Sequence, residues 1–219
     1  MGDFERVSTK KFETKMTKYI NYIYSRMRKF HYVYRSNRET SQDARVLFMD
    51  KELAIDTFVY FTDGQHFTFQ EKTRDADWHR KREFTFEYMN NPQTGEPGEF
   101  FKLGALRYFY GYANANQIGY AEYWILNVAK LKDCCKNYIG IEKLENKYLH
   151  FNRKHGRASF FAIPFWEFEQ CEGVIEYHRN IEQCKSINWK NAEYGDYEQP
   201  IMQGYHRQGQ DQPRAACAY

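Results

Sequence analysis

The chain contains no long hydrophobic run and few cysteines for its 219 residues. No stretch approaches the roughly twenty consecutive apolar residues that a membrane-spanning helix needs, so we expect no membrane partner. The first residues, Met1 to Arg6, lack the apolar core of a signal peptide. The five cysteines are an odd number without the spacing of zinc ligands. Reduced thiols in an intracellular protein are the simplest account, so we expect an intracellular location.

The chain also lacks the loops that hold phosphates in the common nucleotide-binding folds. Gly95-Glu96-Pro97-Gly98 has neither the Lys-Ser/Thr pair of a Walker loop nor the glycine spacing of a dinucleotide-binding turn. We interpret it as a loop that enters a helix. His66, His79 and His155 have no spacing that indicates a zinc site, and solvent-facing or locally bonded side chains are expected for them.

Neither sign of charge dominates the chain. There are 32 Lys and Arg against 29 Asp and Glu, which gives a net charge of +3. This charge is too small to indicate a nucleic-acid-binding protein by itself. Basic residues gather in residues 1–38 and in the segment Trp78-His79-Arg80-Lys81-Arg82. A solvated surface explains both clusters equally well.

Aromatic residues are abundant, with 19 Tyr, 18 Phe and 4 Trp. We expect most of them in the core, because aromatic side chains bury large areas. A few exposed rings would offer flat faces for stacking on nucleic-acid bases or on a protein partner.

The periodicity of apolar residues predicts the order of the elements. The expected helices are 9–30, 38–50 (with Ala44, Leu47 and Phe48 facing inward), 99–113 (with Phe100, Leu103, Leu106 and Tyr110 on its buried side) and part of 166–189. The expected strands are 53–61, 66–73, 83–89, 120–130, and a hairpin formed by 148–151 and 158–165. The turn is Thr62-Asp63-Gly64, the loop is 90–98, and the polar residues 191–219 are expected to form a flexible tail. The length favours one domain over residues 1–190, with a core at 9–130 and an extension at 131–190.

Three consecutive strands with short connections predict an antiparallel meander. The strand at 120–130 follows a predicted helix, so it can lie parallel to a neighbour. The expected fold class is therefore α/β (α+β), a mixed central sheet flanked by helices in the order α-β-β-β-α-β.

The residues that carry the most specific chemistry lie in the first two predicted strands. Asp56 is followed fourteen residues later by Gln70, and Lys72 lies two residues further on. Side chains two apart on a strand share a face. Carboxylate, amide and carbonyl oxygens suit Mg²⁺, and the carbonyl of Glu71 is a further donor. A lysine beside such a metal can orient or deprotonate a water, or stabilise charge on a phosphate.

The turn decides whether Asp56 joins this face. A two-residue loop at Asp63-Gly64 would place Asp56 opposite Glu71, whereas a three-residue loop with a left-handed Gly64 would place it opposite Gln70. We favour the three-residue loop because it brings Asp56, Gln70 and Lys72 together. Glu71 remains the alternative carboxylate.

Over residues 9–130 the chain resembles the PD-(D/E)xK nuclease superfamily. The features that carry the resemblance are Asp56, the fourteen-residue gap, Gln70-x-Lys72 and the element order. The resemblance implies a restriction-endonuclease-like fold, Mg²⁺ (or Mn²⁺) as cofactor, Asp56 as first metal ligand and Lys72 as catalytic lysine. Gln70 stands where most members carry Asp or Glu, and an amide is a weaker ligand. Many members place a further Glu on the first helix, for which the candidates are Glu13, Glu39, Asp50 and Glu52.

The primary hypothesis is a Mg²⁺-dependent endodeoxyribonuclease that hydrolyses phosphodiester bonds in DNA, as a monomer or homodimer. One alternative is an inactive nuclease-fold module that binds nucleic acid or protein, and another is an assembly protein with a tyrosine-rich surface. Lys72 and Arg74 could instead be protective charges on a strand edge, and Asp56 could only cap a turn or pair with Lys72. The residues expected to contact DNA phosphates are Arg74, Arg80, Lys81, Lys102 and Arg107.

Overall fold

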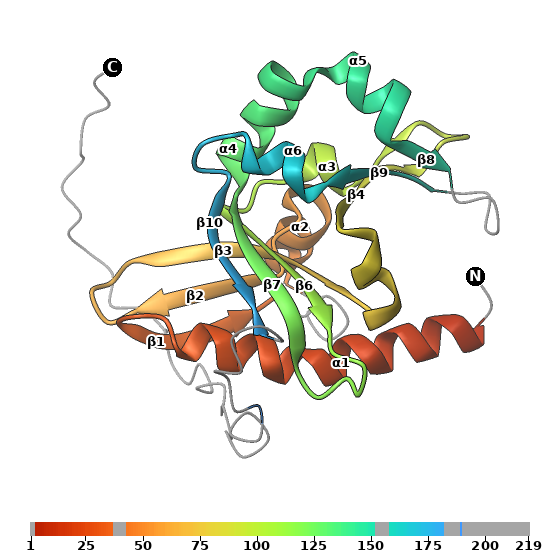
Figure 1. The fold of residues 1–219 in the computed structure, drawn as a ribbon. Coiled ribbons are helices and arrows are strands. Elements are labelled where there is room, and N and C mark those ends of the chain that lie inside the picture. The colour runs from red at the N-terminus through yellow and green to blue at the C-terminus, as the bar shows by residue number, and fades with distance from the viewer. Residues whose placement is uncertain (1–2, 37–42, 152–157, 182–188, 190–219) are drawn as a thin grey trace.

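The computed structural model describes residues 3–36, 43–151, 158–181 and 189, and it contains two β-sheets with helices packed against them (Figure 1). The α-helices are α1 (Asp3–Ser25), α2 (Ala44–Leu53), α3 (Glu99–Lys102), α4 (Val128–Asp133), α5 (Ile141–Lys143) and α6 (Phe165–Glu169). Three further helical segments are wound more tightly or more widely than an α-helix: η1 (Ala76–Lys81), η2 (Cys134–Gly140) and η3 (Leu144–Tyr148). The strands are β1 (Phe30–Arg35), β2 (Thr57–Phe61), β3 (His66–Arg74), β4 (Glu83–Asn91), β5 (Glu96–Pro97), β6 (Arg107–Ala113), β7 (Tyr120–Asn127), β8 (Leu149–Phe151), β9 (Ser159–Pro164) and β10 (Ile175–Asn180).

The central sheet has the strand order β1-β2-β3-β6-β7-β10. Strands β3 and β6 pair in parallel, and the other pairs are antiparallel. The second sheet, β5-β4-β9-β8, is antiparallel. The expected mixed central sheet flanked by helices is therefore confirmed. None of the helices in the described part of the chain is long and apolar enough to cross a membrane.

Helix α1 covers one face of the central sheet (Figure 1). Its buried residues recur at helical spacing, and they pack on Val59, Phe69, Phe109 and Tyr123 of the sheet. The predicted helix at 9–30 is wrong at its C-terminal end, because α1 ends at Ser25 and β1 begins at Phe30. Lys29 adopts a left-handed conformation (φ 64°) that no α-helix contains. Met27 and Phe30 still pack against this core, so the apolar pattern continues beyond the helix.

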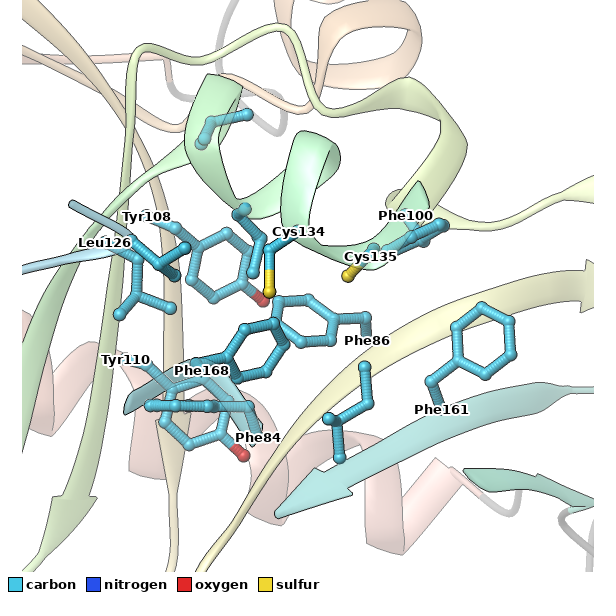
Figure 2. Packing of buried hydrophobic residues seen from close by; sticks show 14 of the residues in the cluster. Phe84, Phe86, Phe100, Tyr108, Tyr110, Leu126, Cys134, Cys135, Phe161 and Phe168 are labelled. Atoms are coloured by element: carbon cyan, nitrogen blue, oxygen red, sulfur yellow. The ribbon is translucent and has the colours of Figure 1, made fainter. Parts of the chain in front are cut away.

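The opposite face of the central sheet packs against the second sheet through an aromatic core (Figure 2). Tyr108 and Tyr110 of β6 meet Phe84 and Phe86 of β4, and all four side chains are fully buried. Phe84 meets Trp124 edge-on, with ring centroids 5.3 Å apart. Such edge-to-face pairs add to the stabilisation from burial alone. The expectation that most aromatic residues lie in the core is borne out for these rings.

The predicted antiparallel meander is wrong because its third strand leaves the central sheet. Strand β4 pairs with β9 and β5, while β3 pairs with β6 instead. The turn η1 separates β3 from β4, with Asp75 capping its start and Arg82 in a left-handed conformation (φ 54°) at its end. This turn redirects the chain towards the second sheet.

The predicted helix at 99–113 is also wrong. Helix α3 ends at Lys102, and β6 begins at Arg107. The N–H of Gly104 bonds to the carbonyl of Leu53 (2.7 Å), which holds the connecting loop. All residues of β6 after Arg107 are buried between β3 and β7, so the strand has no polar alternation. An unbroken apolar run does not distinguish a buried strand from a helix. Leu106, expected to be buried, is 49% exposed.

The remaining predicted elements are confirmed in part and wrong in part. The strand within 120–130 is confirmed as β7, although it runs antiparallel to β6, and the hairpin is confirmed as β8 and β9. Helix α2 begins at Ala44, and its buried residue is Val46 rather than Phe48, which is 55% exposed. Strands β1, β5 and β10 were not predicted. Within 166–189, expected to be helical in part, α6 ends at Glu169 and β10 follows. Residues 38–42, the hairpin turn and the tail at 191–219 lie outside the described residues.

The expectation of reduced thiols is wrong for one pair of cysteines. Cys134 and Cys171 form a disulfide, although 37 positions separate them in the sequence. They meet because η2 and the turn after α6 pack on the same aromatic core. Cys135 is free and buried, and burial raises its pKa to about 12. Cys184 and Cys217 lie outside the described residues.

We predict that reduction of the Cys134–Cys171 disulfide lowers the free energy of unfolding by about 4 kcal/mol, because a loop of this length gains substantial chain entropy when opened. Urea denaturation with and without a reductant measures the difference. The Cys134→Ala/Cys171→Ala variant should unfold at the same urea concentration in both conditions. Identical wild-type curves in both conditions would contradict the disulfide.

Candidate functional site

The β2–β3 hairpin places Asp56 at the end of its ladder, bonded to the backbone of β3. Thr57 pairs with Phe69 and Tyr60 pairs with His66, so the connecting loop comprises Thr62-Asp63-Gly64. Gly64 has a left-handed conformation (φ 82°). The three-residue loop is therefore confirmed, and the paired register of the hairpin ends at Thr57 and Phe69.

Asp56 forms hydrogen bonds at the end of the β2–β3 ladder through both its backbone and its side chain. Its N–H donates to the carbonyl of Phe69 (2.9 Å), and its Oδ2 accepts the N–H of Glu71 (2.8 Å). Ser36, which follows β1, donates through its N–H to the carbonyl of Asp56 (2.9 Å). Asp56 therefore occupies a fixed position at the point where β2 begins. No direct hydrogen bond joins it to Lys72 among the described contacts.

Gln70 and Lys72 lie on the same face of β3, whereas the side chain of Glu71 lies on the other. In the parallel pairing, Gln70 is opposite Tyr108 and Lys72 is opposite Tyr110, whose rings belong to the core between the sheets. The carboxylate of Glu71 instead faces α1. It accepts hydrogen bonds from Tyr24 Oη (3.0 Å) and Arg35 Nη1 (2.6 Å).

The Glu71 carboxylate therefore has a structural partner that the sequence did not indicate. The Arg35–Glu71 ion pair is nearly buried, and the Arg35 guanidinium also donates to Asn21 and Thr57. Its position on the α1 face separates this carboxylate from Gln70 and Lys72. The role of the Glu71 carbonyl as a metal ligand stays a prediction.

Lys72 forms an ion pair that the sequence did not predict. Its Nζ lies 3.3 Å from Oε2 of Glu99, the first residue of α3, and the hydroxyl of Tyr108 donates to the other oxygen of Glu99. Burial alone would lower the pKa of Lys72, but the carboxylates of Glu99 and Glu87 outweigh it, and the pKa is raised. Lys72 is therefore a cation at neutral pH.

Sequence reasoning missed Glu99 because its local signal is ordinary. It follows the N-cap Gly98, and acidic residues are common in the first turn of a helix. The contact joins residues 27 positions apart in the chain, and no local pattern indicates it.

Asp56 lies among negative charges, and its carboxylate forms no ion pair with a described residue, although it interacts at longer range with the Arg35 guanidinium. Burial raises its pKa to about 8, and the charges of Glu71, Glu99 and Asp50 add to the effect, against the Glu71 N–H bond that lowers it. A buried carboxylate in a negative field is stabilised by a nearby cation. Perturbed groups of this kind gather at functional sites.

Gln70 carries the second oxygen of interest. Its Oε1 is buried and accepts no hydrogen bond from the described residues. Leaving such an acceptor without a partner costs free energy, so it is suited to a ligand. The described residues contain no group of three or more His, Cys, Asp and Glu side chains arranged to hold a metal. The role of Asp56 and Gln70 as Mg²⁺ ligands therefore stays a prediction.

The residues expected to contact DNA do not all lie together. Arg74 is on the same face of β3 as Lys72, with its guanidinium 4.7 Å from the ring centre of Trp78. Arg80 and Lys81 are exposed on η1, directly after β3, and Lys102 lies on α3. Arg107 belongs to β6 rather than to a helix, and it forms an ion pair with Glu176.

The basic segment 78–82 divides into two sets of side chains. His79 and Arg82 bind the fully buried carboxylate of Glu122 on β7, which also contacts His178 of β10. These contacts anchor η1 to the central sheet. The solvated-surface interpretation is therefore wrong for His79, while Arg80 and Lys81 remain exposed.

We predict that Asp56→Asn stabilises the metal-free protein increasingly as the pH rises from 5 to 8. The raised pKa means that the folded state holds a proton that the unfolded state has released above about pH 4. Stability therefore falls as the pH rises towards 8, and the asparagine removes this dependence while its amide oxygen can still accept the Glu71 N–H. Urea denaturation in EDTA at several pH values provides the measurement. If Asp56→Asn destabilises the protein equally at every pH, Asp56 acts only as a structural cap.

No protein-family model, curated protein or solved structure matches the chain. The resemblance to the PD-(D/E)xK superfamily therefore rests on the sequence pattern of Asp56, Gln70 and Lys72.

Proposed function

We propose that the chain is a metal-dependent nuclease that hydrolyses phosphodiester bonds in DNA, with a site of the PD-(D/E)xK type. The observation that carries the proposal is that the Asp56 carboxylate accepts the N–H of Glu71 at the end of the β2–β3 ladder, next to Gln70 and Lys72, which share one face of β3. Two features of these residues support the proposal. The pKa of Asp56 is raised to about 8, and the buried Oε1 of Gln70 accepts no hydrogen bond within the described chain.

Asp56 and Gln70 would hold Mg²⁺ or Mn²⁺ through a carboxylate and an amide oxygen. A divalent cation bound there would lower the pKa of a water bound to it and would neutralise negative charge on the phosphate. Asp56 is held in place by the Phe69 carbonyl and the Glu71 N–H, so the site is ordered by the backbone of the hairpin.

Lys72 would act as a cation rather than as a base. Glu99 holds its ammonium group and raises its pKa, so a neutral amine is scarce near pH 7. A charged lysine can orient the attacking water by hydrogen bonding and stabilise negative charge that builds on the phosphate oxygens. Glu99 and Tyr108 are positioning residues in this scheme, because they fix Lys72 without touching the substrate.

DNA would approach through the basic residues that follow Lys72 in the chain. Arg74 lies on the same strand face, and Arg80 and Lys81 are exposed on the adjoining turn η1. Arginine and lysine contacts to phosphates position a duplex without reading its sequence. The proposal covers binding of DNA by one chain or by a homodimer.

A second candidate function is a nuclease-fold module that binds nucleic acid without cutting it. Gln70 favours this alternative, because an amide is a weaker ligand than the carboxylate usual at that position. The lack of a cluster of three metal-ligating side chains in the described residues points the same way. Binding without cleavage in the presence of Mg²⁺ and Mn²⁺ would identify this function.

We expect the protein to nick supercoiled plasmid DNA in Mg²⁺ or Mn²⁺, and not in EDTA. Asp56→Asn and Lys72→Ala should each lower the rate by about 100-fold or more, because each removes a group that acts on the scissile phosphate or its water. Lys132→Ala, at an exposed position on α4, should leave the rate unchanged. Full cleavage by either site variant would exclude this assignment, and nicking in EDTA would exclude the metal.

Gln70→Glu tests the unusual ligand directly. We expect this variant to reach half-maximal nicking at a lower Mg²⁺ concentration than the wild type, because a carboxylate binds a hard cation more tightly than an amide does. Gln70→Leu, which has no oxygen, should require more metal. A metal titration of the nicking rate distinguishes the three proteins. The same Mg²⁺ dependence in all three would show that Gln70 is not a ligand.

A further inference from the structure

A cavity of about 600 Å³ lies between the C-terminal part of α1 and the central sheet. Phe67 and Phe69 of β3 line it, and they alternate along the strand with Thr68 and Gln70. The cavity is therefore on the face of the sheet opposite to Gln70 and Lys72. It is a separate site from the one described above.

The charge of the cavity lining is strongly positive. Four arginines, Arg26, Arg28, Arg107 and Arg179, contribute to it, against the single carboxylate of Glu176. Arg107 and Glu176 form an ion pair with each other. Arg26 and Arg28 are exposed at the end of α1 and form no ion pair with any described residue. Several guanidinium groups around one volume suit a ligand that carries more than one negative oxygen.

Aromatic rings form the walls between these charges. Tyr123 of β7 stacks on Tyr177 of β10, with centroids 5.8 Å apart and planes at 28°. The guanidinium of Arg107 lies 4.9 Å from the ring centre of Phe67, and that of Arg26 lies 5.9 Å from that of Tyr22. Exposed parts of such rings can stack on a planar heterocycle, which an inorganic anion does not require.

We propose that this cavity binds a nucleotide, with its phosphates on Arg26 and Arg28 and its base against the tyrosine and phenylalanine walls. The volume is within the range of small-molecule sites. An anion alone would explain the arginines but not the aromatic walls, and an apolar ligand would explain the walls but not the arginines. The same chemistry serves a free nucleotide and the 5′-phosphorylated terminal nucleotide of a DNA strand.

This proposal goes beyond the nuclease function and does not rest on it. Gln70 and Lys72 lie on the opposite face of β3, and the arginines at the end of α1 take no part in their hydrogen bonds. Binding can therefore be measured in EDTA, where the proposed metal site is empty and DNA is not cleaved. Loss of nuclease activity would leave the result of the binding experiment unchanged.

The test is isothermal titration calorimetry of the full chain at low ionic strength in EDTA. The ligands are AMP, ATP, adenosine, and a short oligothymidylate with and without a 5′-phosphate. The test variant is Arg26→Gln/Arg28→Gln, whose two positions are exposed, so the fold should be retained. The matched control is Lys132→Gln/Lys136→Gln, which makes the same change in charge at exposed positions outside the cavity. Tyr177→Leu removes an aromatic wall.

We expect AMP or ATP to bind and adenosine to bind at least about tenfold more weakly, because each lost charged hydrogen bond to phosphate weakens binding by about this factor. The arginine variant should lose a similar factor for the nucleotide, Tyr177→Leu should bind it more weakly, and the lysine control should match the wild type. Binding of AMP and ATP alone identifies a free nucleotide as the ligand. Binding of the 5′-phosphorylated oligonucleotide alone identifies a strand end. Equal affinities for AMP and adenosine, equal affinities of the arginine variant and the control, or no binding of any phosphorylated ligand would overturn the proposal.

Discussion

The parallel pairing of β3 with β6 is the constraint on which the rest of the structure depends. It places β3 inside the central sheet, so that one face of the strand meets α1 and the other meets the core between the sheets. Alternation along the strand then sends Glu71 towards Tyr24 and Arg35, and Lys72 towards Glu99. The same pairing sets Tyr108 beside Gln70, where its hydroxyl can reach Glu99. Two polar networks therefore lie back to back across a single strand.

These two networks differ in how completely their charges are balanced. On the α1 face, Glu71 has both a guanidinium and a hydroxyl as partners, as buried charges require. On the other face, Lys72 and Glu99 are paired, but Asp56 has a raised pKa and Gln70 has a buried oxygen without a described partner. Imbalance of this kind costs stability, and proteins tolerate it mainly at functional sites. The contrast assigns Glu71 a structural role and leaves Asp56 and Gln70 as the groups on which the proposed function rests.

Local signals in the sequence predicted the β2–β3 hairpin and its three-residue turn. The turn Thr62-Asp63-Gly64 needed a left-handed glycine, and the chain supplies one at the right position. Strands β7, β8 and β9 were predictable from short apolar runs between turn residues. Strand β6 was not, because it is buried on both faces and its apolar run imitates a helix. Mistaking β6 for a helix also hid the parallel pairing and the partner of Lys72.

The sequence by itself determined the mixed α/β character, the β2–β3 hairpin and the placing of Gln70 and Lys72 on one strand face, because turn chemistry and a period of two residues are local properties. Only the tertiary structure decided that β4 joins a second sheet, that Glu99 pairs with Lys72, that Arg35 holds Glu71 and that Cys134 meets Cys171. Each of these contacts joins segments far apart in the chain. Such contacts depend on how sheets and helices pack, and no short stretch of sequence encodes that packing.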